Sequence, residues 1–298
     1  MNIAFITQTY KPDFNECKML CRSMDIFANT YDHFIFVNDE DINHFNELNY
    51  GRHHVLKKST ILPSYFIRLP FKLLGHHFYV SPFSIPMREW IMQQICKLGV
   101  FDVIGDAYDA VFNIDSESVF LKPLDINLLI NGGKFRLFRN ENTELEVAHA
   151  DYCRSIDSIF GGTLPRGQVY KYNYMDMPVC FVRTNMKQML ADISKHSIFK
   201  NWILALANRY RFSENYLYGN YCVNKLCCRN HFLTNKKIMP VLQADSYCTA
   251  EDLYIDFQKA LDEGAVGVVL QKSNRKENLD YIGSGEVWAA IKLLNDNK

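Results

Sequence analysis

The first forty residues contain two apolar runs with a helix-spaced segment between them, and this order restricts the fold to a few topologies. Residues 2–7 (NIAFIT) and 33–38 (HFIFVN) predict buried strands. Between them, residues 13–27 carry apolar side chains at helical spacing, and Asp13 stands at the N-cap position. Strand, helix and strand in this order normally give two parallel strands that are neighbours in one sheet. We therefore expect an α/β fold.

The same alternation continues along the chain. Strands are expected at 110–115 (AVFNID), 134–138, 178–183 and 265–270, and helices from Pro86 to about Phe101 and near 184–195, 198–210, 214–227 and 286–295. Residues 52–83 hold three prolines and predict an irregular insertion. The sequence thus predicts one domain over residues 1–298, with a mostly parallel, Rossmann-like central sheet flanked by helices and a more helical C-terminal half.

Charge and cysteine content exclude several classes. The 33 basic residues equal the 33 acidic ones and form no basic stripe, so no nucleic-acid partner is expected. No apolar stretch approaches the roughly 18 residues that a membrane-spanning helix needs, and the N-terminus does not resemble a signal peptide. The nine cysteines contain no paired CxxC motif, so no zinc ribbon is expected. We expect the protein to reside in the reducing cytoplasm. Peripheral association with the inner face of the cytoplasmic membrane stays open.

The sharpest local signal is the triplet Asp115-Ser116-Glu117 directly after the apolar strand at 110–115. Residues two apart on an extended backbone point the same way, so both carboxylates can address one site. The carboxyl ends of strands are where open α/β sheets bind ligands. Two hard oxygen donors there suit Mg²⁺ or Mn²⁺. Without that strand before it, the triplet is more typical of a solvated turn.

A second signal is Lys97, near the end of the helix WIMQQICKL that precedes this strand. A cation near a helix C-terminus interacts favourably with the helix dipole, so Lys97 is expected either to cap the helix or to reach a phosphate group.

Four motifs in order carry a family resemblance. The start FITQTYKPDF, with CKMLCRSMDIF and HFIFVNDEDINHF, precedes a QQ-x-x-KL helix at 93–98, the acidic triplet, and Ser213-Glu214-x-x-x-Tyr218-Gly219. Over roughly residues 1–225 this pattern resembles GT-A glycosyltransferases. Within them it is similar to a bacterial group found near capsule and lipopolysaccharide gene clusters, long known only as a domain of unknown function. The resemblance implies transfer of a sugar from a nucleotide-sugar donor to a glycan or lipid-linked glycan acceptor.

The resemblance also implies residue roles. Residues 1–125 would form the half that binds the nucleotide sugar, and 126–298 the acceptor-side half, with the insertion at 52–83 shaping the acceptor site or folding over the donor. Asp115 and Glu117 would hold Mn²⁺ or Mg²⁺ on the diphosphate. Glu214 would bind or deprotonate the acceptor hydroxyl, with Asp176 as a second candidate; Ser213 and Glu214 are equally typical of an N-cap and its first-turn acid. The residues expected to bind the donor are Thr7, Gln8, Thr9, Tyr10, Asp39, Gln93, Gln94, Lys97 and Asp115.

Two departures from the family pattern concern the metal. Glu117 stands where the usual motif has Asp, which moves one carboxylate out by one methylene. His231 is the nearest candidate for the C-terminal histidine that completes the metal site in some GT-A families, and we expect it to be structural. The histidine pairs at 53–54 and 76–77 are expected to be surface or loop residues.

Two other functions fit parts of the pattern. A sugar nucleotidyltransferase would share the sheet and the metal, but FITQTYKPDF lacks the glycine- and arginine-rich phosphate loop that such enzymes carry. A non-catalytic glycan-binding or assembly protein on a degenerate GT-A fold would explain Glu117.

Overall fold

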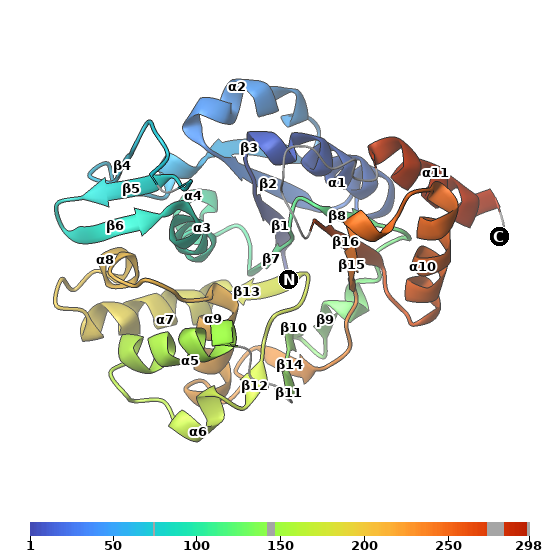
Figure 1. Cartoon of the computed structure of the whole chain (residues 1–298). Coiled ribbons are helices and arrows are strands. Elements are labelled where there is room, and N and C mark those ends of the chain that lie inside the picture. Colours follow the sequence, from blue (N-terminus) through green and yellow to red (C-terminus); the bar gives the residue numbers. More distant parts are fainter. Residues whose placement is uncertain (74, 142–146, 273–282, 297–298) are drawn as a thin grey trace.

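A five-stranded, mostly parallel sheet forms the centre of the molecule (Figure 1). The computed structural model describes residues 1–73, 75–141, 147–272 and 283–296. The sheet has the order β13 (Val179–Val182), β7 (Ala110–Asn113), β1 (Ile3–Gln8), β2 (Asp32–Val37), β3 (His53–Lys57). Neighbouring strands are parallel except at the β13–β7 pair. The predicted parallel pairing of the first two strands and the predicted fold class are confirmed.

Helices cover both faces of this sheet, and strand alternation decides which side chain meets which helix. On β1, Ile3 and Phe5 share a core with α1 (Phe14–Phe27). Ala4 and Ile6 point the other way, into the core that includes α3 (Glu89–Leu98).

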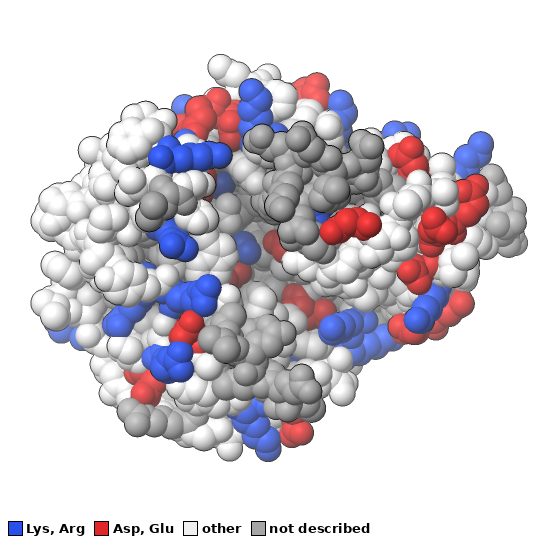
Figure 2. Space-filling view, viewed as in Figure 1, with Lys and Arg blue, Asp and Glu red and all other residues white. Residues whose placement is uncertain are grey.

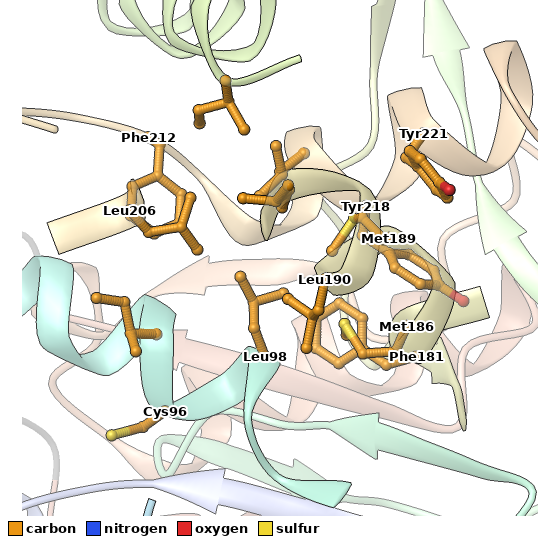
Figure 3. Close-up of a cluster of buried hydrophobic side chains, with 14 of the residues drawn as sticks. Cys96, Leu98, Phe181, Met186, Met189, Leu190, Leu206, Phe212, Tyr218 and Tyr221 are labelled. Carbon is orange, nitrogen blue, oxygen red and sulfur yellow. The ribbon is translucent and has the colours of Figure 1, made fainter. Parts of the chain in front are cut away.

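The second half of the chain supplies most of the helices on the α3 side. They are α5 (Val147–Ile159), α6 (Arg166–Val169), α7 (Arg183–His196), α8 (Trp202–Ala207) and α9 (Glu214–Asn224). Figure 3 shows part of their shared core, in which Leu98 of α3 lies among Phe181 of β13 and Met186, Met189 and Leu190 of α7. This confirms the more helical C-terminal half.

Smaller elements surround this framework. The short helices α2 (Ile42–Phe45) and α4 (Phe101–Ile104) flank the central sheet, and α10 (Ala250–Asp262) packs against α11 (Ser284–Asp296) beside α1. The small sheets are β4 (Ile67–Arg68), β5 (Phe78–Ser81), β6 (Ser84–Arg88); β15 (Val241–Gln243), β16 (Gly267–Gln271), β8 (Ser118–Phe120); β14 (His231–Thr234), β10 (Lys134–Phe138), β9 (Ile130–Asn131); and β11 (Asn140–Glu141), β12 (Tyr172–Asn173). Single 3-10 turns lie at Lys11–Asp13, Asp39–Asp41, Asn46–Leu48, Lys58–Thr60, Ile126–Leu128 and Ala244–Ser246.

Three expectations about local structure are wrong. Pro86 does not open a helix but lies in β6, which pairs with β5 alone and so tolerates a residue without an N–H. The helix expected at 198–210 begins only at Trp202, because the Asn201 side chain caps it by accepting from Leu204 N. His53 is a buried residue of β3 rather than a surface residue.

The Ser-Glu-x-x-x-Tyr-Gly motif forms the first turns of α9, and most of it serves packing. The Ser213 side chain caps the helix by accepting from Tyr216 N. The Tyr218 hydroxyl accepts from Val182 N at 2.8 Å and so ties α9 to β13. Gly219 packs directly against the ring of buried Tyr174, and a Cβ at this position would overlap that ring.

Replacing Gly219 with alanine is therefore expected to destabilise the protein. Alanine favours a helix by about 1 kcal/mol relative to glycine. Overlap with a buried ring costs about 1–3 kcal/mol, since the whole ring must shift. We expect Gly219→Ala to lower the free energy of unfolding, measured by urea denaturation. Gly167→Ala in α6 is the matched control, because a Cβ there meets no atom within 4 Å. Equal stability of the two variants would contradict this account of the motif.

Candidate functional site

The candidate site lies where the order of the central strands changes direction. The chain passes from β1 to β2 on one side, whereas β7 pairs with β1 on the other side. Gln8 ends β1, and Asp115 follows β7 by two residues. Loops that diverge from two such parallel strands leave a crevice at their carboxyl ends, which is the usual ligand site of open α/β sheets.

A pocket of about 340 Å³ occupies this crevice. In the view of Figure 2 the surface is hollowed near its centre, and both acidic and basic side chains are visible there. The pocket takes residues from both halves of the chain: Gln8, Tyr10, Asp13, Trp90, Gln93, Gln94, Lys97, Asp115, Ser116, Glu117, Tyr152, Met175, Met177, Ser213, Glu214, Asn215 and Gln271. The structure thus brings together Gln8, Tyr10, Gln93, Gln94, Lys97, Asp115, Glu117 and Glu214, which were predicted from four separate motifs.

Lys97 provides the positive charge of the pocket. Its Nζ lies 2.9 Å from Oε1 of Glu214 and 3.8 Å from Oδ1 of Asp115. Burial by itself lowers the pKa of the Lys97 ammonium, but attraction to Glu214 and Asp115 outweighs burial, so its pKa lies above the usual value. Lys97 therefore stays charged and does not merely cap α3.

Glu214, in contrast, is almost fully enclosed. Its side chain is 3% exposed, against 41% for Asp115. The side-chain amide of Gln94 lies against the carboxylate, and because the carboxylate can only accept, we assign the amide nitrogen to this side. Glu214 then accepts from both Gln94 and Lys97. Gln94 and Lys97 lie on one face of α3, and Glu214 opens α9, so this cluster connects the two helices.

The acidic triplet is held between two strands. Ser118 N donates to Asp115 O at 3.1 Å and closes a turn, and Leu270 N of β16 donates to Glu117 O at 2.8 Å. The triplet therefore has a fixed backbone, with both carboxylates lining the pocket. Carboxylate oxygens are the ligands that Mg²⁺ and Mn²⁺ prefer, so the residues present fit such an ion. Gln271, the residue after Leu270, supplies a further side-chain oxygen or nitrogen to this wall.

Two amide side chains of the wall have unsatisfied polar atoms. Both the Oε1 and Nε2 atoms of Gln8 and the Oδ1 atom of Asn215 are buried and make no hydrogen bond to any described residue. Buried polar atoms are normally paired, and a missing partner therefore points to a bound ligand or water. The unpaired atoms of Gln8 and Asn215 thus point to a polar ligand.

Two aromatic side chains of the pocket, those of Trp90 and Tyr152, were not predicted from the sequence as site residues. Trp90 stacks on Tyr152, with ring centroids 6.0 Å apart and planes inclined by 22°. Trp90 precedes Gln94 by four residues and Lys97 by seven, which places all three on one helix face. That spacing was visible in the sequence. Tyr152 lies on α5, a helix that was not predicted from the sequence.

Three predicted donor residues do not line this pocket. The Thr7 hydroxyl donates to Ile114 O at 2.9 Å and contacts Nε2 of His33 at 2.8 Å. Thr9 is buried, and its carbonyl accepts from Lys58 Nζ at 2.8 Å. Asp39 accepts from the Ser59 hydroxyl at 2.6 Å and lines a separate pocket of about 470 Å³. Thr7 and Thr9 therefore shape the backbone beside the site.

Asp176 and His231 also lie outside the pocket. Asp176 forms a buried ion pair with Arg136, although its neighbours Met175 and Met177 line the pocket. His231 is buried on β14, where Nε2 lies 2.8 Å from the Tyr218 hydroxyl, and burial lowers its pKa to about 4. This agrees with the structural role expected for His231.

Comparison with known proteins identifies a family and a fold. The model of the Family of unknown function (DUF6492) matches residues 2–279. No curated protein matches the sequence at a significant level. In the part of the chain that the structure describes, no helix has the length and apolarity that crossing a membrane requires.

Solved structures with a similar fold are glycosyltransferases. The apo structure of the bifunctional glycosyltransferase WbbM aligns with a TM-score of 0.50 and 11% identity over 97% of this chain and 49% of that chain, so the present chain spans about half of that protein. Mouse xyloside xylosyltransferase 1 in its apo form aligns with a TM-score of 0.45 and 8% identity over 90% of this chain and 97% of that one. The fold is that of GT-A-type glycosyltransferases, as expected from the motifs.

The enclosure of Glu214 leads to a stability prediction. Lys97→Met removes the cation and leaves a buried carboxylate unpaired, which costs about 3–5 kcal/mol. We expect urea denaturation to show this loss, and Glu214→Gln in the same chain to restore part of it. Lys187→Met is the control, because its exposed pair with Asp106 contributes at most about 1 kcal/mol. No recovery in the double variant would show that the pair does not govern the stability of this site.

Proposed function

Because the chain belongs to the Family of unknown function (DUF6492), its activity must be inferred from its own site, and we propose that it transfers a sugar from a nucleotide-sugar donor to a hydroxyl group of a glycan acceptor. One observation carries the proposal. Asp115, Glu117, Lys97 and Gln8 converge in one pocket at the strand switch point of a glycosyltransferase fold. This is where that fold has room for a diphosphate with a sugar attached.

The residues of the pocket stabilise the leaving diphosphate in different ways. Lys97 places an ammonium beside it and offsets the negative charge that grows as the glycosidic bond to the phosphate breaks. Asp115 and Glu117 would hold Mn²⁺ or Mg²⁺, which supplies Lewis-acid stabilisation of the same charge. The unpaired amide of Gln8 would hydrogen-bond to the donor.

Glu214 acts as a positioning residue for Lys97 in this proposal. Its carboxylate already accepts from Lys97 and Gln94 and is almost fully enclosed. With 3% of the side chain exposed, little of the carboxylate is open to an acceptor hydroxyl. The role of general base, expected from the sequence, is therefore the alternative that kinetics must separate from positioning. Asp176 has no part in the reaction as proposed, because its ion pair with Arg136 lies outside the pocket.

The acceptor would enter from the side of Trp90. The stacked rings of Trp90 and Tyr152 offer a flat apolar surface of the kind that sugar rings pack against. Residues 1–125 supply the diphosphate side of the pocket, and residues 126–298 supply Tyr152, Met175, Met177, Ser213, Glu214, Asn215 and Gln271. Because Trp90 belongs to residues 1–125, the acceptor side of the pocket takes residues from both halves of the chain.

A groove lined by several arginines, distinct from the pocket that contains Lys97, supports an anionic acceptor. It has a volume of about 760 Å³, and its lining includes Arg88, Arg154, Arg209 and Arg211 against one acid, Asp151. A smaller pocket shares Arg88 with this groove and shares Trp90 and Gln93 with the pocket that contains Lys97. We propose a lipid-linked glycan that carries phosphate, as in the synthesis of capsule or lipopolysaccharide, with transfer at the inner face of the cytoplasmic membrane.

Ligand-dependent thermal unfolding tests the donor site. We expect one class among UDP-, GDP-, CMP- and dTDP-sugars to raise the unfolding midpoint, and to do so only with Mn²⁺ or Mg²⁺. A ligand that binds only the folded state at a hundred times its Kd adds about 2.7 kcal/mol. Asp115→Asn should abolish the shift, since it removes a metal-binding carboxylate. Asp106→Asn, an exposed residue outside the pocket, should leave it unchanged. If no nucleotide moves the midpoint under any metal condition, the proposed donor site is wrong.

Kinetics of Glu214→Gln separate positioning from proton transfer. Glutamine keeps an oxygen that can accept from Lys97, so we expect a raised donor KM, a fall in kcat of about tenfold or less, and an unchanged pH profile. A general base would instead lose about 10²–10⁴ in kcat together with the acidic limb of the profile. Rates measured from pH 5 to 9 with the donor found above decide between the two, and loss of the acidic limb would return Glu214 to the role of base.

A further inference from the structure

A second cluster of chemically reactive side chains lies on the opposite face of the central sheet. It consists of Cys21 on α1, His33 on β2 and His53 on β3. The two histidines occupy paired positions of neighbouring strands, and their Nδ1 atoms are 3.1 Å apart. The Cys21 sulfur lies 3.9 Å from His33 Nδ1. All three side chains are buried, and the three donor atoms lie within 4.8 Å of one another.

Hydrogen bonds on the outer side of each ring fix where the imidazole protons are. Thr7 uses its single hydroxyl hydrogen to donate to Ile114 O, so it can only accept from His33, and His33 carries its proton on Nε2. His53 Nε2 lies 3.1 Å from a carboxylate oxygen of Asp25, which can only accept. Each neutral ring therefore directs the lone pair of its Nδ1 into the cluster.

Two lone pairs that face each other at 3.1 Å, next to a cysteine sulfur, repel unless a cation lies between them. The described core beside the cluster is apolar and includes Cys17, Ile35, Val37, Phe45 and Leu48, and the Asp25 carboxylate lies on the outer side of the His53 ring. We propose that Cys21, His33 and His53 bind a structural Zn²⁺ ion. Thiolate sulfur and neutral imidazole nitrogen are the donors that zinc prefers.

The distances suit this ion. Bond lengths of about 2.0–2.1 Å to nitrogen and 2.3 Å to sulfur in a tetrahedral shell place donor atoms roughly 3.3–3.6 Å apart. The observed 3.1 and 3.9 Å require shifts of only a few tenths of an ångström. Asp25 and Thr7 supply the outer hydrogen bonds that metal-binding histidines usually make.

Cys17 is positioned to supply the fourth donor. It lies one helical turn before Cys21 on the same face of α1, and its sulfur would have to move to join the three donor atoms that lie within 4.8 Å of one another. Cys17-x-x-x-Cys21 with His33 and His53 would complete a Cys₂His₂ shell. Such an ion would bind α1 to β2 and β3 on the face opposite the pocket that contains Lys97. It would be separate from any ion held by Asp115 and Glu117.

Metal analysis of the intact protein tests this proposal. We expect about one zinc per chain in protein expressed with zinc and purified without chelators. After removal of zinc, titration with Co²⁺ should give the thiolate-to-cobalt absorption and visible bands of a tetrahedral site. Cys21→Ser should weaken the thiolate band and Cys17→Ser/Cys21→Ser should abolish it, and Asp25→Asn should weaken binding about 10- to 100-fold. Cys180→Ala, a buried cysteine of β13, and Asp115→Asn should both leave the spectrum unchanged.

The wild-type titration keeps the test decisive even if Cys21→Ser fails to fold, because it needs no variant. Zinc should also raise the unfolding midpoint of the metal-free wild type. Substoichiometric zinc together with no cobalt–thiolate band would overturn the proposal. The cation between the histidines would then be a proton, and the cluster a buried thiolate–imidazolium pair.

Discussion

The buried ion pair between Lys97 and Glu214 joins two residues that are 117 positions apart and connects α3 to α9. Burying two charges costs about as much as their attraction returns, so such a pair contributes little net stability. Its main effect is to set the position of α3 relative to α9. Because the enclosed Glu214 carboxylate needs a cationic partner, the Lys97 ammonium is held next to it. The same ammonium then also lies beside Asp115. The relative placement of the two halves and the electrostatics of the pocket thus depend on the same contact.

Strand β1 connects this pocket to the opposite face of the sheet. Its successive side chains alternate in direction, so Gln8 faces the pocket while Thr7 faces α1 and His33. The Thr7 hydroxyl also bonds to the carbonyl of Ile114, the residue before Asp115. A shift of His33 would therefore be transmitted to the backbone that carries the acidic triplet. The cysteine–histidine cluster and the candidate active site share this strand end.

Sequence patterns were sufficient where local periodicity determines the outcome. The strand before Asp115 and the helix that carries Gln94 and Lys97 were predicted from spacing alone. That these side chains share one site was implied by the family resemblance, and the structure brings them together in one pocket. What could not be predicted depends on pairing between distant segments. His53 looked like a loop residue because nothing local shows that its strand pairs with the strand of His33. The partner of Asp176, Arg136, is likewise set by tertiary packing.

The charge of the pocket explains why a glutamate at position 117 can replace the aspartate of the usual motif. Among the described residues of the wall, four carboxylates, Asp13, Asp115, Glu117 and Glu214, face one ammonium, that of Lys97. A diphosphate entering this wall alone would be repelled by the excess of negative charge. A divalent cation reverses the local sign and makes the same wall attractive to phosphate. Glu117 retains the carboxylate on which this reversal depends, and its backbone is held by β16. The longer side chain is therefore compatible with a working donor site and gives no reason to regard the fold as degenerate.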